Sequence, residues 1–137
     1  MTIRVGINGF GRIGRTFVRR SLERGDIEVV AVNDITDART LSHLLEFDSV
    51  YGRLPATVTY TGDAIVINGR PVRVLSSRDP AEIDWGELGA DVVVESSGKF
   101  RAREQAALHL KGGGWYDNEW GYTCRLADLT VIVGGQL

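Results

Sequence analysis

The sequence predicts an α/β fold built on a doubly wound, mostly parallel sheet, and three observations lead to this prediction. The chain opens with apolar residues on alternate positions, which is typical of a strand. A glycine-rich turn and a helical pattern follow directly, and a second apolar run then ends in an acidic residue. Strands that alternate with helices favour a parallel sheet covered by helices. The 137 residues are enough for one domain with its own core.

The turn after the first strand has the spacing G-x-G-x-x-G, at Gly9, Gly11 and Gly14. In such a turn the first glycine permits a sharp bend and the second lets the backbone approach a pyrophosphate. The third lets the new helix lie close to the sheet. The helix predicted at residues 11–23 would direct its first amide groups toward the anion. The same glycines could instead be a plain connector, so a second element is needed to decide.

An acidic residue at the end of the second strand favours the nucleotide interpretation. Residues 27–34 form such a strand, and Asp34 lies 20 positions beyond Gly14. This spacing suits a carboxylate that holds the ribose hydroxyls of a dinucleotide. We predict NAD rather than NADP, because Asp34 would repel a 2′-phosphate and no arginine directly follows it.

The predicted first helix also carries four arginines. We expect Arg15, Arg19 and Arg20 to form a solvated face opposite the apolar stripe of the helix. Arg12 differs, because it lies inside the turn and therefore beside the predicted anion site.

The middle of the chain predicts a second helix and then an antiparallel meander. Thr36 and Asp37 can cap this helix, and an apolar pattern that includes Leu44 and Phe47 follows them. Glycine-containing turns separate three short strands. These strands are predicted at residues 57–60, 64–67 and 72–75.

The segment after the meander predicts a helix start and a buried strand. Residues 79–82 combine a capping aspartate, a proline and a glutamate, which favours a helix start. Arg78, just before it, is either a surface arginine or a flat group over an adenine ring. Residues 91–95 are typical of a strand buried on both faces, and ligands of doubly wound sheets bind at such strand ends.

Composition excludes several classes of protein. The hydrophobic share of 43% and the charged share of 25% are ordinary for a globular domain. A net charge of −2 gives no general affinity for nucleic acid or anionic membranes, and no apolar run approaches the ~18 residues of a membrane span. We expect a cytoplasmic location, because the chain enters a strand without a signal peptide and its one cysteine cannot form an internal disulfide.

Several motifs occur together in this chain, at residues 5–15, 32–34, 43–45, 48–50, 77–80 and 95–98. Together they resemble the cofactor half of phosphorylating glyceraldehyde-3-phosphate dehydrogenase of the bacterial type, a glycolytic oxidoreductase. Residues 115–119 resemble the segment that opens the C-terminal helix of that enzyme. The resemblance implies a truncated Rossmann-type sheet with an inserted antiparallel meander, a C-terminal helix, and NAD as cofactor.

The resemblance also implies roles for the residues of the adenosine half of the site, beside the turn of Gly9 and Gly11. Family residues that match Arg12 and Ile13 bind the pyrophosphate. The match of Asp34 holds the adenosine ribose. The match of Arg78 lies at the adenine.

The nicotinamide half of the site is implied by the same resemblance. Family residues that match Ser96, Ser97, Gly98 and Phe100 border the nicotinamide, and the match of Asn118 bonds its carboxamide. Ser97 stands where threonine is usual, and it keeps the hydroxyl group.

The residues that carry the family's chemistry have no counterpart in this sequence. The family places its nucleophile in a Ser-Cys-Thr-Thr-Asn motif and its base histidine in a long substrate domain. Cys124 falls in the predicted last helix, where a packed thiol is the simpler interpretation, and His43 and His109 match no catalytic position. No cluster has metal-ligand spacing. We therefore predict NAD binding without aldehyde oxidation, with no catalytic residue and no metal.

A run of three glycines predicts a join in the chain. We predict a dinucleotide-binding domain at residues 1–111, a glycine linker at 112–114 that replaces the substrate domain, and a C-terminal helix at 115–137 that packs back on the same domain. We interpret the chain as an engineered, isolated nucleotide-binding domain rather than a natural short paralogue. The strand at 92–94 would then be an open sheet edge, so we expect a homodimer through that edge or by helix exchange.

Two other functions stay open. The chain could be part of a working dehydrogenase that another chain completes with the missing thiol and base. It could also be a nucleic-acid-binding module that uses the nucleotide site, although the charge balance disfavours this.

Overall fold

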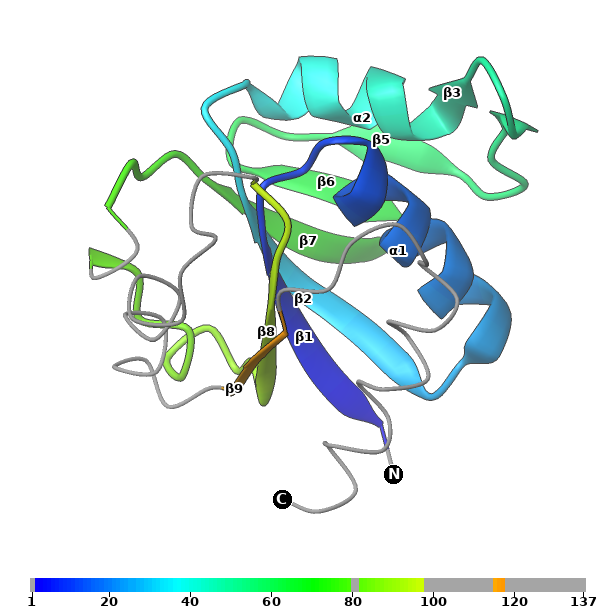
Figure 1. Cartoon of the computed structure of the whole chain (residues 1–137). Helices are drawn as coiled ribbons and strands as arrows, with labels where there is room; N and C mark the ends of the chain where they lie inside the picture. The colour runs from blue at the N-terminus through cyan, green and yellow to red at the C-terminus, as the bar shows by residue number, and fades with distance from the viewer. Residues whose placement is uncertain (1, 80–81, 98–114, 118–137) are drawn as a thin grey trace.

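The structure is a computed structural model, and it describes residues 2–79, 82–97 and 115–117. Helices and strands alternate along the first part of the chain, as predicted (Figure 1). The elements are β1 (Ile3–Asn8), α1 (Arg12–Arg24), β2 (Ile27–Asn33), α2 (Ala38–Glu46), β3 (Phe47–Asp48), β4 (Gly52–Arg53), β5 (Val58–Tyr60), β6 (Ala64–Ile67), β7 (Arg70–Leu75), β8 (Val92–Glu95) and β9 (Trp115–Asp117).

Seven of these strands form one sheet in the order β5-β6-β7-β2-β1-β8-β9. β1 lies inside the sheet and pairs in parallel with β2 on one side and with β8 on the other. β2 pairs in parallel with β7, whereas β5, β6 and β7 form an antiparallel meander. The predicted fold class, a mostly parallel, doubly wound sheet with an inserted meander, is therefore confirmed. β3 and β4 form a separate antiparallel pair.

The core lies on both faces of the sheet, because successive side chains of a strand point to opposite faces. On one face, Val5 and Ile7 of β1 pack with Phe17 of α1 and Leu45 of α2, and all four side chains are fully buried. Both helices cover this face, as Figure 1 shows.

Trp85 is the largest buried side chain of the second face, where a smaller apolar cluster includes Ala31 and Val93. Its indole ring lies against Gly6 of β1, so closely that a Cβ at Gly6 would overlap the ring. A glycine inside a strand often marks such a close approach. No local pattern in the sequence indicates this contact.

Of the predicted helix start at residues 79–82, residues 80 and 81 lie outside the described residues. The amide of Glu82 donates to the carbonyl of Asp79 at 3.0 Å, a hydrogen bond between residues three positions apart that is typical of a 3₁₀ turn. The described residues that follow form turns. Ile83 and Trp85 bury their side chains there, and Gly89 bends the chain with a φ of 86°. Ile83 and Trp85 thus belong to the core of the second face.

The prediction that residues 92–94 form an open sheet edge is wrong, because β9 pairs in parallel with β8. β9 lies at the start of the range predicted as a C-terminal helix, and these three residues form a strand instead. The rest of that range and the predicted glycine linker at 112–114 lie outside the described residues, as do Cys124 and His109.

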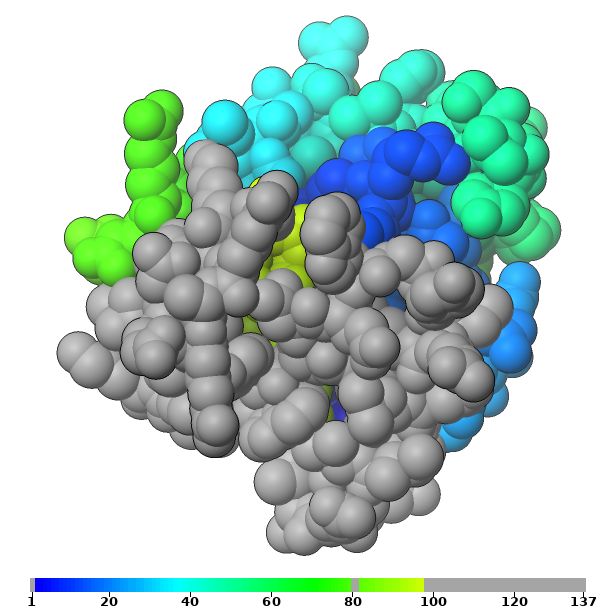
Figure 2. All heavy atoms as spheres, in the orientation of Figure 1, coloured from blue at the N-terminus to red at the C-terminus, as the bar shows by residue number. Residues whose placement is uncertain are grey.

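Arg19 ties α1 to the end of α2, so its assignment to a solvated face is wrong. Its Nη2 donates to the carbonyl oxygens of Leu45 and Gly52, both at 2.8 Å. The carbonyl of Leu45 belongs to the last turn of α2, where backbone acceptors lack helical partners, and that of Gly52 belongs to β4. The two helices adjoin at the surface of the molecule (Figure 2). Arg20, one residue further on, pairs with Glu23 at 2.8 Å.

Candidate functional site

A cleft of about 250 Å³ opens where β1, β2, β7 and β8 end at their carboxyl termini. In doubly wound sheets this is where ligands bind, beside the strand at which the direction of winding reverses. Here that strand is β1, because the chain proceeds to β2 on one side and later to β8 on the other. The cleft is lined by Asn8, Gly9, Gly11, Asn33, Asp34, Ile35, Ser77, Arg78, Ser96 and Ser97.

The glycine turn between β1 and α1 forms one wall of the cleft. Gly9 has a φ of 92°, and a Cβ there would overlap the backbone of Ser97, so this position requires glycine. A Cβ at Gly14 would lie 2.6 Å from the carbonyl oxygen of Gly9, which explains how α1 packs so close to the sheet. At Gly11, by contrast, a Cβ would meet nothing within 4 Å. The turn is therefore open at Gly11, where the motif predicts the approach of a pyrophosphate.

The N-terminus of α1 lies beside this opening, and within the described part of the chain its first amide groups have no helical partner. Gly11 is the N-cap, no side chain caps this end, and the first turn of the helix has no acidic residue. The first helical hydrogen bond runs from the amide of Arg15 to the carbonyl of Gly11, at 2.9 Å. The amides before Arg15 have no helical partner, and together with the helix dipole they favour an anion.

Asp34 lies immediately after β2 and is fixed against the glycine turn. Its Oδ2 accepts a hydrogen bond from the amide of Phe10 at 2.9 Å, and its Oδ1 accepts one from the amide of Thr36 at 3.0 Å. Its own amide donates to the carbonyl of Leu75 at the end of β7. A carboxylate oxygen has more than one acceptor position, so both oxygens can still accept from ribose hydroxyls. The carboxylate and the turn thus form one rigid unit.

Arg12 contributes its backbone to the turn, but its side chain pairs with Asp48. The Arg12 Nη1 and Asp48 Oδ2 lie 3.5 Å apart, and the Asp48 side chain is only 5% exposed. Hydrogen bonds from the amides of Tyr51 and Val50 to Oδ1 hold the pKa of Asp48 below its ordinary value. Within the part of the chain that the structure describes, neither Arg12 nor Ile13 lines the cleft.

Arg15 also stabilises the turn, so the prediction that it is a solvated residue is wrong. Its Nη1 donates to the carbonyl of Phe10 at 3.0 Å, and its side chain is partly buried. Burial, followed by the nearby charge of Arg12, lowers the pKa of the Arg15 guanidinium. Hydrogen bonds therefore fix the backbone of Phe10 on both sides, since Asp34 accepts from its amide and Arg15 donates to its carbonyl.

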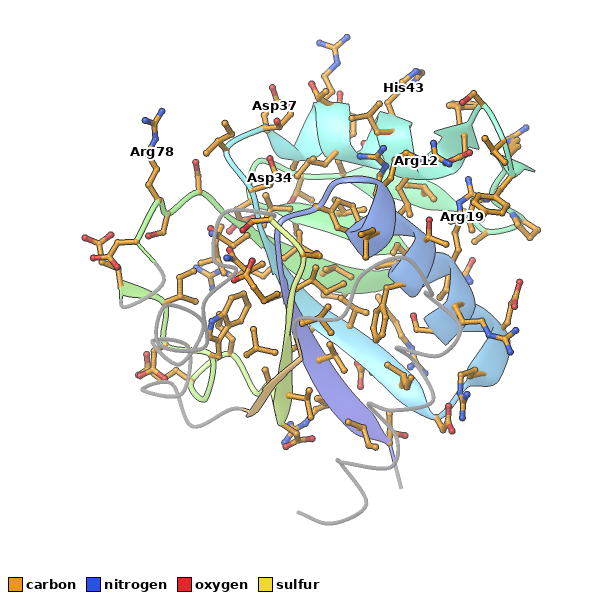
Figure 3. The ribbon with its side chains drawn as sticks, viewed as in Figure 1. Arg12, Arg19, Asp34, Asp37, His43 and Arg78 are labelled. Carbon is orange, nitrogen blue, oxygen red and sulfur yellow. The ribbon has the colours of Figure 1, made fainter. Side chains whose placement is uncertain are left out.

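Arg78 lies at the rim of the cleft, and its side chain extends away from Asp34 into solvent (Figure 3). Both interpretations of this residue from the sequence therefore stay possible. Ser96 lies opposite, where its Oγ donates to the carbonyl of Gly9 at 2.6 Å. Gly98, Phe100 and Asn118, which the resemblance places at the nicotinamide, lie outside the described residues.

A buried polar network joins the strand ends at the cleft, and the sequence did not predict it. Asn8 and Asn33 end β1 and β2, Glu95 ends β8, and these three side chains are 3–6% exposed. Nδ2 of Asn8 donates to Oε2 of Glu95, and Nδ2 of Asn33 donates to Oδ1 of Asn8, both at 2.8 Å. The signal in the sequence was the polar residue that closes each apolar strand, at the edge where ligands bind.

Two further properties concern the described residues only. No group of three or more His, Cys, Asp and Glu side chains is placed to hold a metal ion in this part of the chain. None of its helices combines the length and apolar character that crossing a membrane requires.

Comparison with known proteins agrees with this geometry. Residues 3–103 match the model of a protein family described as glyceraldehyde 3-phosphate dehydrogenase, NAD binding domain. The chain belongs to this family. The family indicates NAD as the cofactor, and the open turn at Gly11 and the fixed carboxylate of Asp34 fit the pyrophosphate and ribose of that molecule.

Individual glyceraldehyde-3-phosphate dehydrogenases are also similar to the chain. It is 58% identical over 113 residues to that of Geobacillus stearothermophilus and 56% identical over 114 residues to that of Streptomyces coelicolor. A plasmid-encoded form from Cupriavidus necator is 53% identical over 116 residues. Each match covers 82% of this chain but 34% of the relative, so the chain spans about a third of the length of these dehydrogenases.

Proposed function

We propose that this chain binds NAD at the cleft above β1 and β2 and does not oxidise an aldehyde by itself. The observation that carries the proposal is the contact between the Asp34 carboxylate and the Phe10 amide. This contact places the group suited to the ribose directly beside the helix N-terminus suited to the pyrophosphate. Neither group alone would be specific for a dinucleotide.

The proposed binding mode gives each part of the cofactor a distinct environment. The pyrophosphate lies at the open turn of Gly11, next to the first amides of α1 at Arg12 and Ile13, and the adenosine ribose lies at Asp34. The adenine extends toward Arg78, whose guanidinium could stack on the ring. The nicotinamide, which supplies a hydride acceptor when NAD is bound, lies on the side of Ser97.

A titration with NAD tests the proposal directly. We expect calorimetry to show binding weaker than that of a complete dehydrogenase, because this chain spans only about a third of such enzymes. NADP should bind more weakly still, because its 2′-phosphate would face the Asp34 carboxylate. Binding that stays undetectable at millimolar NAD would overturn the proposal.

Two aspartate variants separate the ribose contact from general charge effects. Asp34→Ala should lower the affinity for NAD about 10- to 100-fold, the effect of losing hydrogen bonds to a charged group. Asp63→Asn removes the same charge at an exposed position outside the cleft and should leave the affinity unchanged. Equal affinities of the two variants would exclude the ribose role of Asp34.

Catalysis by a completed enzyme is the second candidate, because the relatives are dehydrogenases about three times as long as the matched segment. Another chain would then supply the thiol and the base. Adding glyceraldehyde 3-phosphate, phosphate and NAD and following nicotinamide absorbance, with and without a chain that carries the thiol and the base, distinguishes the two. Turnover with that chain supports the second candidate, and we expect no turnover in either mixture. We further propose a cytoplasmic location, on the basis of the single cysteine, and an engineered origin, on the basis of the run of three glycines at residues 112–114.

A further inference from the structure

The buried polar network connects the ends of four parallel strands. Oε1 of Glu95 accepts from the amide and the hydroxyl of Ser97, at 3.0 and 2.6 Å. Its Oε2 accepts from Nδ2 of Asn8, whose Oδ1 accepts from Nδ2 of Asn33. Asn33 then exchanges two bonds of 2.8 Å with the backbone of Ser77, donating to its carbonyl and accepting from its amide.

This chain of hydrogen bonds has a fixed direction. The backbone amide and carbonyl of Ser77 cannot exchange places. They therefore determine the positions of Nδ2 and Oδ1 in the Asn33 side chain. At the other end, the Glu95 carboxylate only accepts, so it sets which end of the Asn8 amide faces it. The two constraints agree, because the oxygen of Asn8 then meets the nitrogen of Asn33.

Each member of the network adjoins a wall of the cleft. Gly9 follows Asn8, Asp34 follows Asn33, and Arg78 follows Ser77. Backbone bonds add to these connections, since the amide of Gly9 donates to the carbonyl of Asn33 at 2.8 Å. A change in the direction of the side-chain bonds would therefore disturb all walls of the cleft together.

We propose that Glu95 is a positioning residue for nucleotide binding. Its buried carboxylate sets the direction of the Asn8–Asn33–Ser77 hydrogen bonds and so fixes the glycine turn, the Asp34 carboxylate and the Ser77 loop relative to one another. Glu95 acts through these groups and does not contact the nucleotide. This inference rests on the proposed function, because it concerns the same cleft.

Exchanging an acid and an amide tests the direction of the bonds. In Glu95→Gln, the new amide nitrogen is a donor that faces another donor, either Nδ2 of Asn8 or the amide and hydroxyl of Ser97. Rotating the side-chain amide of Asn8 only moves this mismatch between two donors to Nδ2 of Asn33. Asn8→Asp alone places two carboxylates face to face. The double variant Asn8→Asp/Glu95→Gln restores a donor opposite an acceptor in each of the hydrogen bonds described above, and it keeps the net charge of the original chain.

We expect Glu95→Gln to weaken NAD binding about tenfold and to increase hydrogen exchange at the amide of Ser77. The double variant should recover NAD affinity to within about threefold and restore protection of that amide. Glu28→Gln, at the far end of β2, serves as a control and should change neither measurement. If Glu95→Gln does not fold, recovery of folding in the double variant supports the same conclusion.

Two results would overturn the inference. One is a Glu95→Gln chain that binds NAD and protects the Ser77 amide as the unmodified chain does. The other is a double variant that is at least as impaired as the more impaired single variant. If the proposed function were wrong, the unmodified chain would not bind NAD. The hydrogen-exchange measurements at Ser77 would still decide the role of Glu95.

Discussion

Substituting alanine at two glycines of the turn, Gly9 and Gly11, should separate folding from binding. In Gly9→Ala, the new side chain has to adopt a φ of 92°, which costs about 1–2 kcal/mol for a residue with a Cβ. The same Cβ overlaps the backbone of Ser97 and lies 2.7 Å from the carbonyl carbon of Ser96, and such overpacking costs about 1–3 kcal/mol. We therefore expect a loss of about 2–5 kcal/mol from a domain whose total stability is about 5–15 kcal/mol.

Gly11→Ala is the matched variant, since its Cβ would meet nothing within 4 Å and its φ is −79°. Its stability should change by less than about 1 kcal/mol, the scale of a change at an N-cap. Affinity for NAD should nevertheless fall at least about tenfold, because the Cβ occupies the space through which a pyrophosphate approaches the backbone.

Urea unfolding and calorimetry measure the two effects. With a slope of about 1.5 kcal/mol/M, the midpoint of Gly9→Ala should fall by about 1–3 M, while that of Gly11→Ala stays within about 0.7 M. An unchanged midpoint for Gly9→Ala would refute the close packing of the turn on β8. Unchanged NAD affinity in Gly11→Ala would refute the approach of a pyrophosphate at that residue.

The remaining predictions concern other parts of the fold. Arg19→Lys should lower the free energy of unfolding in urea by about 1–3 kcal/mol, because an ammonium group cannot span the carbonyl oxygens of Leu45 in α2 and Gly52 in β4. The pKa of Asp48 is lower in the folded chain than in the unfolded chain, so its stabilising effect is complete above the unfolded value near 4 and is lost as the pH falls through the folded value. Thermal unfolding between about pH 2 and 6 should show this dependence, and Asp48→Asn should reduce it. Gly6→Ala should destabilise the chain by about 1–3 kcal/mol in urea, because its Cβ overlaps the ring of Trp85. Light scattering at high protein concentration should show a dimer formed by exchange of the predicted C-terminal helix, and a monomeric mass would exclude that exchange.

The sequence was most informative where one local pattern determines one local structure. Alternating apolar residues, the glycine spacing and the acidic strand end predicted β1, α1, β2 and the place of Asp34, because each depends on neighbouring residues. Asp37 caps α2 as predicted, accepting from the amide of Thr40 at 2.7 Å.

Features that depend on distant contacts could not be predicted in this way. Arg15 and Arg19 resemble surface residues in the sequence, but their acceptors are backbone carbonyls that only the folded chain brings near. The pairing of β9 with β8 and the packing of Trp85 on Gly6 likewise join separate segments. Residues 91–95 were predicted as a buried strand, yet nothing local showed that Glu95 would form hydrogen bonds with the polar residues at the ends of other strands.

The central place of β1 has a consequence for how the molecule assembles. Its pairing with β2 closes a short stretch of chain, whereas the contact between Asn8 and Glu95 joins residues 87 positions apart. Closing the longer loop has the larger entropic cost, and the contact stabilises the chain only after the intervening segments have folded. We therefore expect β8 to dock late. A nucleotide that needs both sides of the cleft would then bind only the completed fold, and its presence would slow unfolding by favouring that state.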